Sequence, residues 1–327
     1  MITYHLLLST DKKKLTKMKQ IKILSVNISE NKGTIKHSVP EIIINYLGVE
    51  NDAHAGFWHR QVSMLASESI KSFEGDLGRE IKFGEFGENI TTEGMLLYNC
   101  NPLDRFISGN TILEVTQIGK KCHGDGCEIF RKVGNCVMPK EGIFCRVISS
   151  GILKPYDILE FYPKTYKIGV ITLSDRASKG VYEDLSGAAI IKKISEFYSN
   201  QNKEFEVYSK IIPDEETILK SEIEKLCNEN YDIIITTGGT GISKRDITPD
   251  VLSKLFDKDI PGIMDAIRLK FGVEKPQALT SRSIAGVKDN TLIFVLPGSV
   301  KAVNEYMNEI TKHFNHLILM INNIDSH

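Results

Sequence analysis

The stretch TTGGTGISKRDITPD, residues 236–250, contains the residues best suited to chemistry, and it follows the apolar run DIII. Glycines at the end of a strand let backbone N–H groups point into one concavity, where an anion such as phosphate can bind. The stretch matches neither the P-loop pattern GxxxxGK[ST] nor the dinucleotide pattern GxGxxG. A carboxylate beside two cations, here Asp246 after Lys244 and Arg245, suits Mg²⁺ on a polyphosphate. A tight turn without a ligand is the simpler alternative.

Similar polar residues follow three other apolar runs in the same half of the chain. They are Ser174-Asp175, Pro213-Asp214 and Pro297-Gly298-Ser299. Because the carboxyl ends of parallel strands meet at one edge of a sheet, Asp175, Asp214 and Asp246 could converge and hold Mg²⁺. Each aspartate alone is more often a cap or turn residue. The set favours phosphoryl or nucleotidyl transfer, which depends mainly on positioning and charge neutralisation.

Strands and helices alternate between residues 166 and 325. A continuous apolar run predicts a strand at residues 168–173, and VYSKIIP, DIIITT and LIFVLP predict strands at 207–213, 232–237 and 292–297. Apolar residues three or four apart predict helices at 188–197 and 215–229, and one long helix through residues 303–314. Thr248 and Ser299 suit N-caps. The alternation predicts a three-layer α/β domain with a mostly parallel sheet.

Residues 20–163 show a different pattern. Short runs broken by Gly, Asn and Asp, among them GENITTEG, TILEVTQIG, GIFCRVI and YDILEFY, predict an all-β, barrel-like domain. One helix is predicted at MLASESIKSFEG, and the domain boundary falls in PKTY. The first 17 residues are interpreted as a disordered basic tail, or as residues before a second start at Met18. Their apolar part is too short to span a membrane and precedes the basic part, unlike a signal peptide.

Composition limits the class of protein. The chain has 327 residues, 41% hydrophobic and 25% charged, with a net charge of −1. This length predicts two domains, and the charge gives no reason to expect nucleic acid or a membrane surface as a partner. Six cysteines without a secretory signal favour a reducing cytoplasm and free thiols.

Four potential ligands, Cys122, His123, Cys127 and Cys136, lie close together in the first half. Zinc, buried thiols and a reactive thiolate are the three interpretations. The spacing is looser than a CxxC knuckle and no second pair follows, which disfavours zinc. Lys120 and Lys121 precede Cys122 and would favour its thiolate. Cys145, in a strand-like run, is interpreted as a buried structural thiol.

A second polar group surrounds the only tryptophan of the chain. His54, His59, Arg60 and Gln61 could form a cluster for an anionic ligand, although a lone histidine is more often structural. Trp58 is interpreted as a packing residue rather than a stacking platform.

Five motifs in the second half, in the order ITLSDRASKGVYEDLSG, IIPDEE, TTGGTGISKRDITPD, SRSIAG and LPGSVKAV, are similar to the molybdopterin adenylyltransferase (MogA/MoaB) family. The resemblance covers about residues 166–322. It implies that molybdopterin and ATP, with Mg²⁺, give adenylylated molybdopterin and pyrophosphate, and that the protein is a homotrimer. It also implies that Asp214 and Asp246 are the catalytic, metal-binding acids. The other site residues it implies are Ser174, Asp175, Gly238, Gly239, Thr240, Gly241, Thr248, Asp250, Pro297, Gly298 and Ser299.

The motifs GTIKHSV, DAHAGFWHRQVSMLA, FGENITTEG and LEVTQIGKKCH resemble a MOSC domain over about residues 20–160. This resemblance implies a β-barrel whose functional cysteine, Cys122, carries sulfur or meets the molybdenum cofactor. It assigns no role to Cys127 or Cys136. Nothing resembles a pyridoxal-phosphate desulfurase, so a partner would have to donate the sulfur.

Together the resemblances predict a bifunctional protein of molybdenum cofactor biosynthesis, with a MOSC domain at 20–163 and an adenylyltransferase domain at 166–325. A molybdate-insertion enzyme is a possible partner. PGSVKA is similar to a branch of the family in which not all members are active, whereas RDITPD is similar to the active branch. A non-catalytic scaffold that binds molybdopterin is therefore the alternative.

Overall fold

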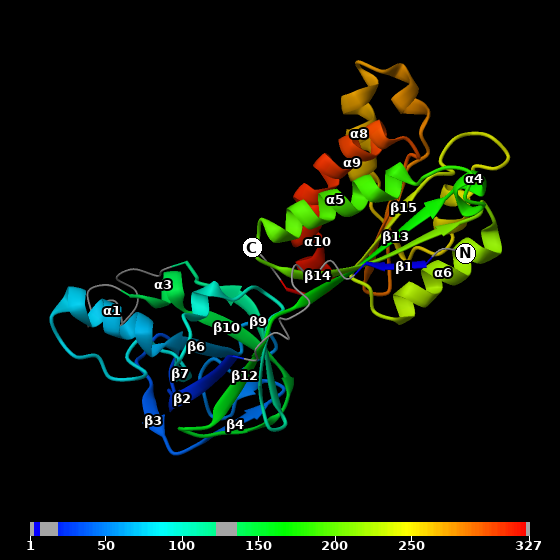
Figure 1. The fold of residues 1–327 in the computed structure, drawn as a ribbon. Coiled ribbons are helices and arrows are strands. Elements are labelled where there is room, and N and C mark those ends of the chain that lie inside the picture. Colours follow the sequence, from blue (N-terminus) through cyan, green and yellow to red (C-terminus); the bar gives the residue numbers. More distant parts are fainter. Residues whose placement is uncertain (1–2, 7–18, 122–135, 325–327) are drawn as a thin grey trace. The chain divides into compact units, whose positions relative to one another are not determined.

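The computed structural model describes residues 3–6, 19–121 and 136–324 (Figure 1). The chain divides into two compact units, Lys13–Lys164 and Thr165–His327, and the second unit also includes the first strand, β1 (Thr3–Leu6). No helix in these described ranges has both the length and the apolar character needed to cross a membrane.

The N-terminal unit is a closed barrel of seven strands. The barrel order is β12-β8-β9-β10-β6-β7-β2, and the pairing of β12 with β2 closes the ring. Its strands are β2 (Lys19–Ile28), β6 (Val62–Ala66), β7 (Ile90–Glu93), β8 (Arg105–Ser108), β9 (Thr111–Ile118), β10 (Ile143–Ser149) and β12 (Ile158–Tyr162). All neighbours are antiparallel except β6 and β7. The predicted all-β barrel is confirmed.

Smaller elements surround this barrel. Strand β3 (His37–Val39) extends β2, and β11 (Gly151–Leu153), β4 (Ile42–Asn45) and β5 (Gly48–Val49) form a separate sheet. The helical elements are α1 (Ser67–Leu77), η1 (Leu97–Asn99) and α3 (Met138–Glu141). Helix α1 begins three residues later than predicted, because Met64, Leu65 and Ala66 complete the fully buried strand β6.

The barrel interior is filled by the inward-facing residues of its strands. Ile23, Phe106, Leu113 and Leu159 are all 0% exposed and belong to one hydrophobic cluster. Burial of such side chains removes apolar area from water at about 25 cal/mol per Å². The barrel is therefore a packed core, and any ligand site must lie outside it or at its rim.

The C-terminal unit is built on a mixed sheet of seven strands, in the order β1-β14-β13-β15-β18-β17-β16. Four central strands are parallel: β14 (Glu204–Ile212), β13 (Thr165–Leu173), β15 (Ile233–Thr237) and β18 (Thr291–Leu296). The outer strands β1, β17 (Ala285–Lys288) and β16 (Lys258–Asp259) pair antiparallel. The prediction of a mostly parallel sheet therefore holds only for the centre, because a hairpin and the N-terminal strand extend its edges.

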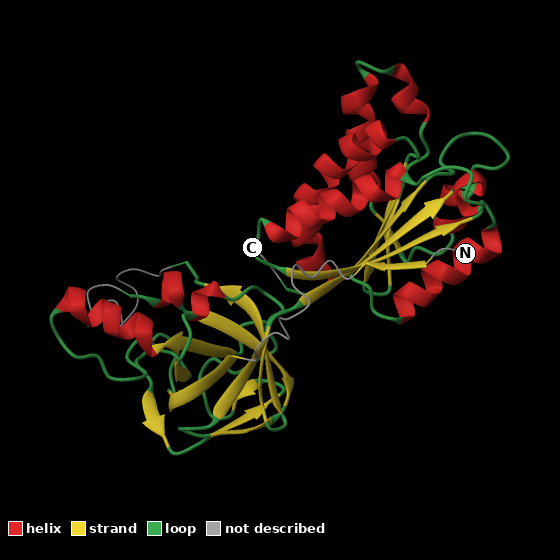
Figure 2. Cartoon of the chain, in the orientation of Figure 1, coloured by secondary structure: helices red, strands yellow, loops and turns green. Residues whose placement is uncertain are grey.

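Helices cover both faces of this sheet (Figures 1 and 2). Helices α5 (Leu185–Ser199), α9 (Val300–Ile310) and α10 (Phe314–Ile321) lie on one face, where Phe314 packs 5.5 Å from the Phe294 ring of β18. Helices α6 (Glu216–Asn228) and α7 (Thr248–Leu252) lie on the other, where Leu219, Leu252 and Ile171 share a cluster. The remaining helical elements are α4 (Asp175–Ser178), α8 (Pro261–Gly272), η3 (Pro276–Thr280) and η4 (Thr311–His313).

Two predictions about this unit need correction. The long final helix is broken into α9, η4 and α10, and the Thr311 hydroxyl at the break donates to the Met307 carbonyl at 2.8 Å. Such a bond to the preceding turn commonly bends a helix. The interpretation of the first residues as a disordered tail is wrong for Thr3–Leu6, which pair with β14. Residues 7–18 lie outside the described part.

Candidate functional site

The glycine-rich stretch turns back on itself directly after β15. Gly238 and Gly239 have φ angles of +99° and +62°, a region that favours glycine. A Cβ on Gly238 would meet the Leu173 carbonyl of the neighbouring strand, and a Cβ on Gly239 would meet the Thr248 hydroxyl. Gly298 lies against Gly238, because its own added Cβ would be 3.4 Å from the Gly238 Cα. The backbone of this loop is therefore held in a conformation that other residues would disrupt.

Thr248 stabilises this loop, and it does not cap a helix as predicted. Its hydroxyl donates to the Gly238 carbonyl at 2.9 Å and its N–H donates to the Gly239 carbonyl at 3.1 Å. Helix α7 begins at Thr248, and Ile247 occupies the cap position without a side-chain hydrogen bond. The hydroxyl does not cap the helix, because it donates to a buried carbonyl of the loop instead.

Arg282 is a residue of the site that the sequence reasoning missed. Its guanidinium donates to the Gly241 carbonyl at 2.7 Å, to the Asp246 carbonyl, and to both Asp250 oxygens at 2.7 and 2.8 Å. Its N–H also donates to the Thr240 carbonyl at 3.0 Å. One planar side chain thus ties both ends of the loop together. The signal was present in the motif SRSIAG, whose arginine was not singled out.

The three predicted aspartates lie within electrostatic reach of one another. The Asp175 N–H donates to Asp214 Oδ2 at 3.2 Å, and the Asp214 N–H donates to Asp175 Oδ1 at 3.3 Å. Asp246 Oδ2 accepts from the Ser243 N–H at 2.8 Å, and a Cβ on Gly241 would lie 2.7 Å from the same oxygen. Glycine at position 241 therefore allows the Asp246 carboxylate to lie against the loop.

The two central carboxylates have opposite pKa shifts. Burial, with the negative charges of Asp175 and Asp246, raises the pKa of Asp214, although the Asp175 N–H and Arg245 oppose this. Burial alone would raise the pKa of Asp246, but hydrogen bonds from Ser243 and the charge of Arg282 hold it below its ordinary value. Asp246 is therefore a stable carboxylate, and Asp214 is the carboxylate that would gain most from a nearby cation.

The remaining predicted residues occupy the same sheet edge. Ser174 caps α4 by accepting from the Ala177 N–H at 3.2 Å, and Ser299 caps α9 as predicted, accepting from the Ala302 N–H at 3.3 Å. The Pro297 and Gly298 carbonyls accept from Thr237 at 2.8 Å and Ser186 at 2.6 Å. The structure thus brings the loop, the aspartates and both caps to the carboxyl ends of β13, β14, β15 and β18.

The donor set at this edge fits Mg²⁺. Carboxylate oxygens are the ligands this hard cation prefers, and it is often held by one or two carboxylates together with substrate phosphates. Within the described ranges, no three His, Cys, Asp or Glu side chains are grouped as a complete metal site. The residues that would hold Mg²⁺ are Asp214 and Asp246, and phosphate oxygens would complete its coordination.

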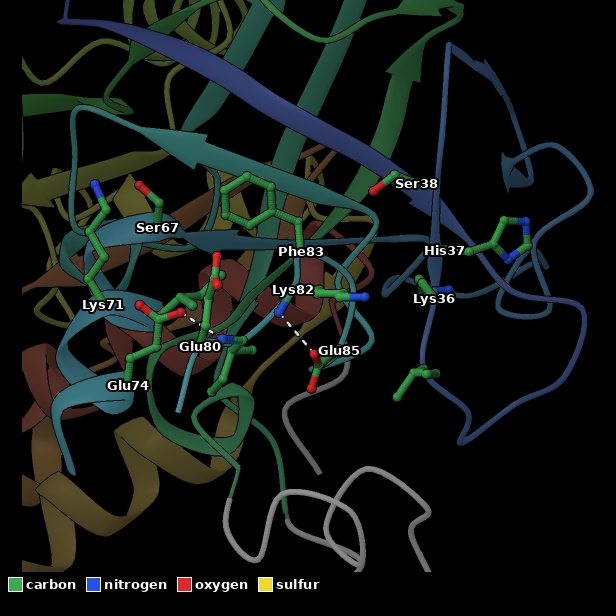
Figure 3. Close-up of a pocket in the computed structure, with 13 residues that line it drawn as sticks. Lys36, His37, Ser38, Ser67, Lys71, Glu74, Glu80, Lys82, Phe83 and Glu85 are labelled. Carbon is green, nitrogen blue, oxygen red and sulfur yellow. Dashed lines mark hydrogen bonds between the residues drawn. The ribbon is translucent and has the colours of Figure 1, made fainter. Parts of the chain in front are cut away.

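Two hollows in the structure are lined by none of the predicted site residues. One, of about 950 Å³, lies between α5, the loop before it and β14, and includes Tyr182, Lys192 and Lys210. The other lies beside α1 on the barrel (Figure 3). There Glu74 accepts from the Ile81 N–H at 2.7 Å and Glu85 accepts from the Lys82 N–H at 2.9 Å, so these carboxylates hold the loop.

A third hollow on the barrel is basic, and we call it the basic hollow. Its volume is about 350 Å³, and its lining residues are Lys32, Gly33, Thr34, His54, Trp58, Arg60, Ser63, Phe86, Gly87, Asn89, Lys120, Met138 and Phe144. The Arg60 guanidinium lies 4.8 Å from the centre of the Trp58 ring. Trp58 is 37% exposed, so its interpretation as a packing residue is wrong: it forms a wall of a cavity.

The polar cluster predicted around Trp58 is only partly assembled. His54 and Arg60 line the basic hollow, but His59 and Gln61 do not. The Gln61 amide donates to the Tyr46 and Gly56 carbonyls at 2.7 and 3.1 Å and accepts from the Val147 N–H at 2.7 Å. Gln61 is therefore structural, since its amide is used to hold backbone.

The cysteines divide between described and undescribed parts of the chain. Cys122, His123 and Cys127 lie outside the described residues, so the structure gives no geometry for them. Cys145 is 0% exposed, and burial raises its thiol pKa, which confirms its interpretation as a structural thiol. Cys136 packs against a small cluster that contains Val137 and Met138.

Comparisons with known proteins agree with this division of the chain. The family model described as "Probable molybdopterin binding domain" matches residues 169–316, and that of the MOSC domain matches residues 51–160. The fold and the site therefore define a molybdopterin-binding α/β domain fused to a MOSC barrel.

Named relatives match the α/β domain. The molybdopterin adenylyltransferase of Helicobacter pylori is 40% identical over 148 residues, which cover 45% of this chain and 82% of that protein. That of Pyrococcus furiosus is 36% identical, covering 48% of this chain and 91% of that protein. A crystal structure of the molybdopterin biosynthesis enzyme MoaB from Thermus thermophilus is 31% identical, with a TM-score of 0.44. The match covers 48% of this chain and 97% of that chain. The chain belongs to the molybdopterin adenylyltransferase family, a family of molybdenum cofactor biosynthesis enzymes.

Gly239→Ala should separate backbone strain from steric conflict in the loop. Gly180 also has a positive φ, of +71°, but an added Cβ there meets nothing within 4 Å, and Gly262 in α8 has neither constraint. We expect Gly239→Ala to cost about 1–3 kcal/mol, Gly180→Ala about 1 kcal/mol, and Gly262→Ala to be neutral or stabilising. Chemical denaturation measures the three free energies of unfolding. Equal costs at positions 239 and 180 would show that contact with Thr248 is unimportant.

Asp214→Asn should stabilise the fold at neutral pH. Folding raises the pKa of Asp214, so ionisation penalises the folded state. The penalty is absent below the unfolded pKa of about 4 and complete above the raised folded value. Calorimetry should therefore show a higher Tm than wild type near pH ~7 and no gain near pH ~3.5. Asp259→Asn, at an exposed position of β16, is the control and should leave the Tm unchanged at both pH values. A lower Tm for Asp214→Asn at neutral pH would contradict the shift.

Proposed function

We propose that the C-terminal domain transfers AMP from ATP to molybdopterin in a Mg²⁺-dependent reaction. The observation that carries this proposal is the meeting of Asp175, Asp214 and Asp246 beside the glycine loop at the carboxyl ends of parallel strands. Open α/β sheets bind ligands at that edge. Family membership adds the substrate class, because the relatives are named molybdopterin adenylyltransferases.

In the proposed reaction, a terminal phosphate oxygen of molybdopterin attacks the α-phosphorus of ATP. A new P–O bond forms, the bond to the β-phosphate oxygen breaks, and pyrophosphate leaves. The Gly238 N–H donates to the Leu296 carbonyl at 3.2 Å, so the N–H groups of residues 239–241 are the ones that would bind phosphate or pterin, and Thr248 and Arg282 keep the loop in place. Bound Mg²⁺ would supply positive charge to the phosphate oxygens. Ser174, Asp175, Asp250, Pro297, Gly298 and Ser299 complete the walls of the site.

The electrostatics favour an enzyme over a scaffold that only binds molybdopterin. Asp175 and Asp246 both disfavour ionisation of Asp214, so the grouping of these carboxylates carries an electrostatic penalty. A cation removes the penalty, whereas an anionic ligand alone would increase it. A scaffold that only binds anionic molybdopterin would not need this group of carboxylates. The scaffold remains the second candidate because the PGSVKA motif is similar to a branch of the family in which not all members are active.

We further propose that the MOSC domain binds the cofactor, or carries sulfur through Cys122. The basic hollow supports this, because four of its lining side chains, Lys32, His54, Arg60 and Lys120, can carry positive charge. The partners we propose are a molybdate-insertion enzyme, a sulfur donor and two further copies of the chain in a homotrimer. The free thiols suit a reducing cytoplasm.

Direct assay tests the transferase. Pure protein incubated with molybdopterin, ATP and Mg²⁺ should form adenylylated molybdopterin, detected by mass. Asp246→Asn and Asp214→Asn should each lower kcat at least about 100-fold, since electrostatic stabilisation of phosphoryl transfer is lost. Asp259→Asn should retain wild-type rates. Tight molybdopterin binding without any product from the wild type would reject the enzyme and leave the scaffold.

Thiol chemistry tests the MOSC half. Iodoacetamide should modify Cys122 in the native protein, whereas Cys100 and Cys145 should resist it, because burial raises both of their pKa values. Peptide mass mapping measures the modification, and Cys122→Ser should abolish the fastest step. A stoichiometric zinc that disappears in Cys122→Ser would instead favour a structural metal module.

A further inference from the structure

A buried ion pair contacts His54, one of the residues that line the basic hollow. The Lys36 ammonium pairs with Asp52, and both side chains are 0% exposed. The Ser29 N–H donates to Asp52 Oδ2 at 3.0 Å, and Lys36 also lies 3.4 Å from the Ser29 hydroxyl. Desolvation of two charges makes such a pair weak as a stabilising element, and apolar residues of similar volume are often as stable. The pair therefore calls for a reason beyond the stability of the barrel.

Both members of the pair contact one edge of the His54 ring. His54 Nδ1 lies 3.4 Å from the Lys36 nitrogen and 3.5 Å from Asp52 Oδ1. The backbone is also held, because the His54 N–H donates to Asp52 Oδ1 at 3.0 Å and the His54 carbonyl accepts from Trp58 Nε1 at 2.9 Å. The ring is 29% exposed and lines the basic hollow. Because Nδ1 is the nitrogen at the ion pair, Nε2 is the ring nitrogen that these contacts leave for a ligand.

The pair also selects where the His54 proton resides. An ammonium has donors and no acceptor, so the Lys36 contact is satisfied in the neutral ring only when Nδ1 accepts and the proton is on Nε2; the Asp52 carboxylate, 3.5 Å from the same nitrogen, is already paired with Lys36. When the ring is protonated, Nδ1–H can donate to Asp52 and Nε2 still carries a proton. Both states of the ring thus present an N–H at Nε2. This is the tautomer that binds an oxygen anion.

The hollow matches such a ligand in charge. Its described lining contains three further cations, Lys32, Arg60 and Lys120, and no carboxylate. The carboxylates of Asp52 and Glu88 act on Lys36 and do not line the hollow: Asp52 is paired with Lys36, and Glu88 is fully buried, with burial raising its pKa. Trp58, Phe86 and Phe144 supply apolar walls.

We propose that Lys36 and Asp52 are positioning residues that fix His54 as an N–H donor, through Nε2, to a tetrahedral oxyanion bound in the basic hollow. The oxyanion is either inorganic or the terminal phosphate of molybdopterin. The inference rests on the proposed cofactor-binding role of the MOSC domain and names the group of the ligand that the hollow recognises.

The N–H of His54 then contributes to affinity. The groups that face its ring from the packed elements are Lys36, Asp52, Arg60 and the other cations of the hollow. Asp52 stays ionised, because its hydrogen bonds to His54 and Lys36 outweigh burial and hold its pKa well below the ordinary range. Loss of the His54 donor should therefore weaken binding of an oxyanion.

The chain supplies its own probe for this site. Trp58 is the only tryptophan and lines the hollow, so its fluorescence reports binding there and not at the C-terminal domain. The full-length protein is titrated with phosphate, molybdate and molybdopterin over a range of about pH 5.5–8.5. A response to the inorganic ions shows that the oxyanion alone suffices, and a response to molybdopterin but not to dephosphorylated molybdopterin identifies the phosphate of the cofactor as the source.

His54→Gln should weaken binding about tenfold or more and alter its pH dependence, since one charge-assisted hydrogen bond is lost. His37→Gln, at an exposed histidine of β3, is the matched control and should behave as wild type. Lys36→Met leaves Asp52 unpaired, so the double variant Lys36→Met/Asp52→Asn is also measured, with its fold checked by circular dichroism. It should weaken binding and alter the pH profile although neither residue lines the ligand side of His54.

The outcomes separate this inference from the proposed function. A folded double variant with wild-type affinity and pH profile would overturn the positioning role, and so would an unchanged His54→Gln, while cofactor binding by the MOSC domain would stand. No response of wild-type Trp58 to any of the three ligands would reject both for this domain. Adenylylation, measured on the same samples, should be unaffected by all of these variants.

Discussion

The C-terminal site depends on the close approach of two backbone segments at the end of β15. Gly238 can lie against the Leu173 carbonyl, and Gly239 against the Thr248 hydroxyl, only because neither residue has a Cβ. The positive φ angles of both residues turn the chain sharply enough to bring Asp246 back toward Asp214. Thr248 and Arg282 then hold the returning segment by hydrogen bonds to loop carbonyls. A strained loop and a cluster of like charges are both costs to stability, and they occur together where ligand binding can offset them.

The sequence predicted those parts of the fold that follow from local periodicity. Apolar runs identified the four central strands, and the Gly-rich turn identified the sheet edge where the aspartates meet. Periodicity could not predict β1 or the β16–β17 hairpin, because their pairing is set by long-range contacts at the sheet edges. It also joined α9 to α10, because the apolar spacing continues through the Thr311 break.

Side-chain partners were harder to predict than positions. Thr248 precedes Pro249 and has every local feature of a cap, yet a buried carbonyl ten residues earlier in the chain takes its hydroxyl. Gln61 lies next to Arg60 in sequence, but neighbouring side chains of an extended segment point to opposite sides. The Gln61 amide therefore donates to the Tyr46 carbonyl and does not line the hollow. Lys36 and Asp52 were not singled out at all, since a pair sixteen residues apart is visible only after the barrel has closed. Which donor meets which acceptor is a property of the folded chain.

The two domains carry opposite charges at their candidate sites. The α/β domain gathers carboxylates, and in the proposed reaction a cation would offset their charge when phosphates bind. The barrel gathers cations around a hollow whose described lining has no carboxylate, and Asp52 beside His54 is paired with Lys36, so the hollow suits an anion directly. Molybdopterin is a phosphate ester, and any product of adenylylation retains negative phosphates. Under the proposed functions, both domains would recognise the same anionic group, one with a metal ion and one without. This difference gives a physical reason why one chain can join them without the two sites competing for the same bound form.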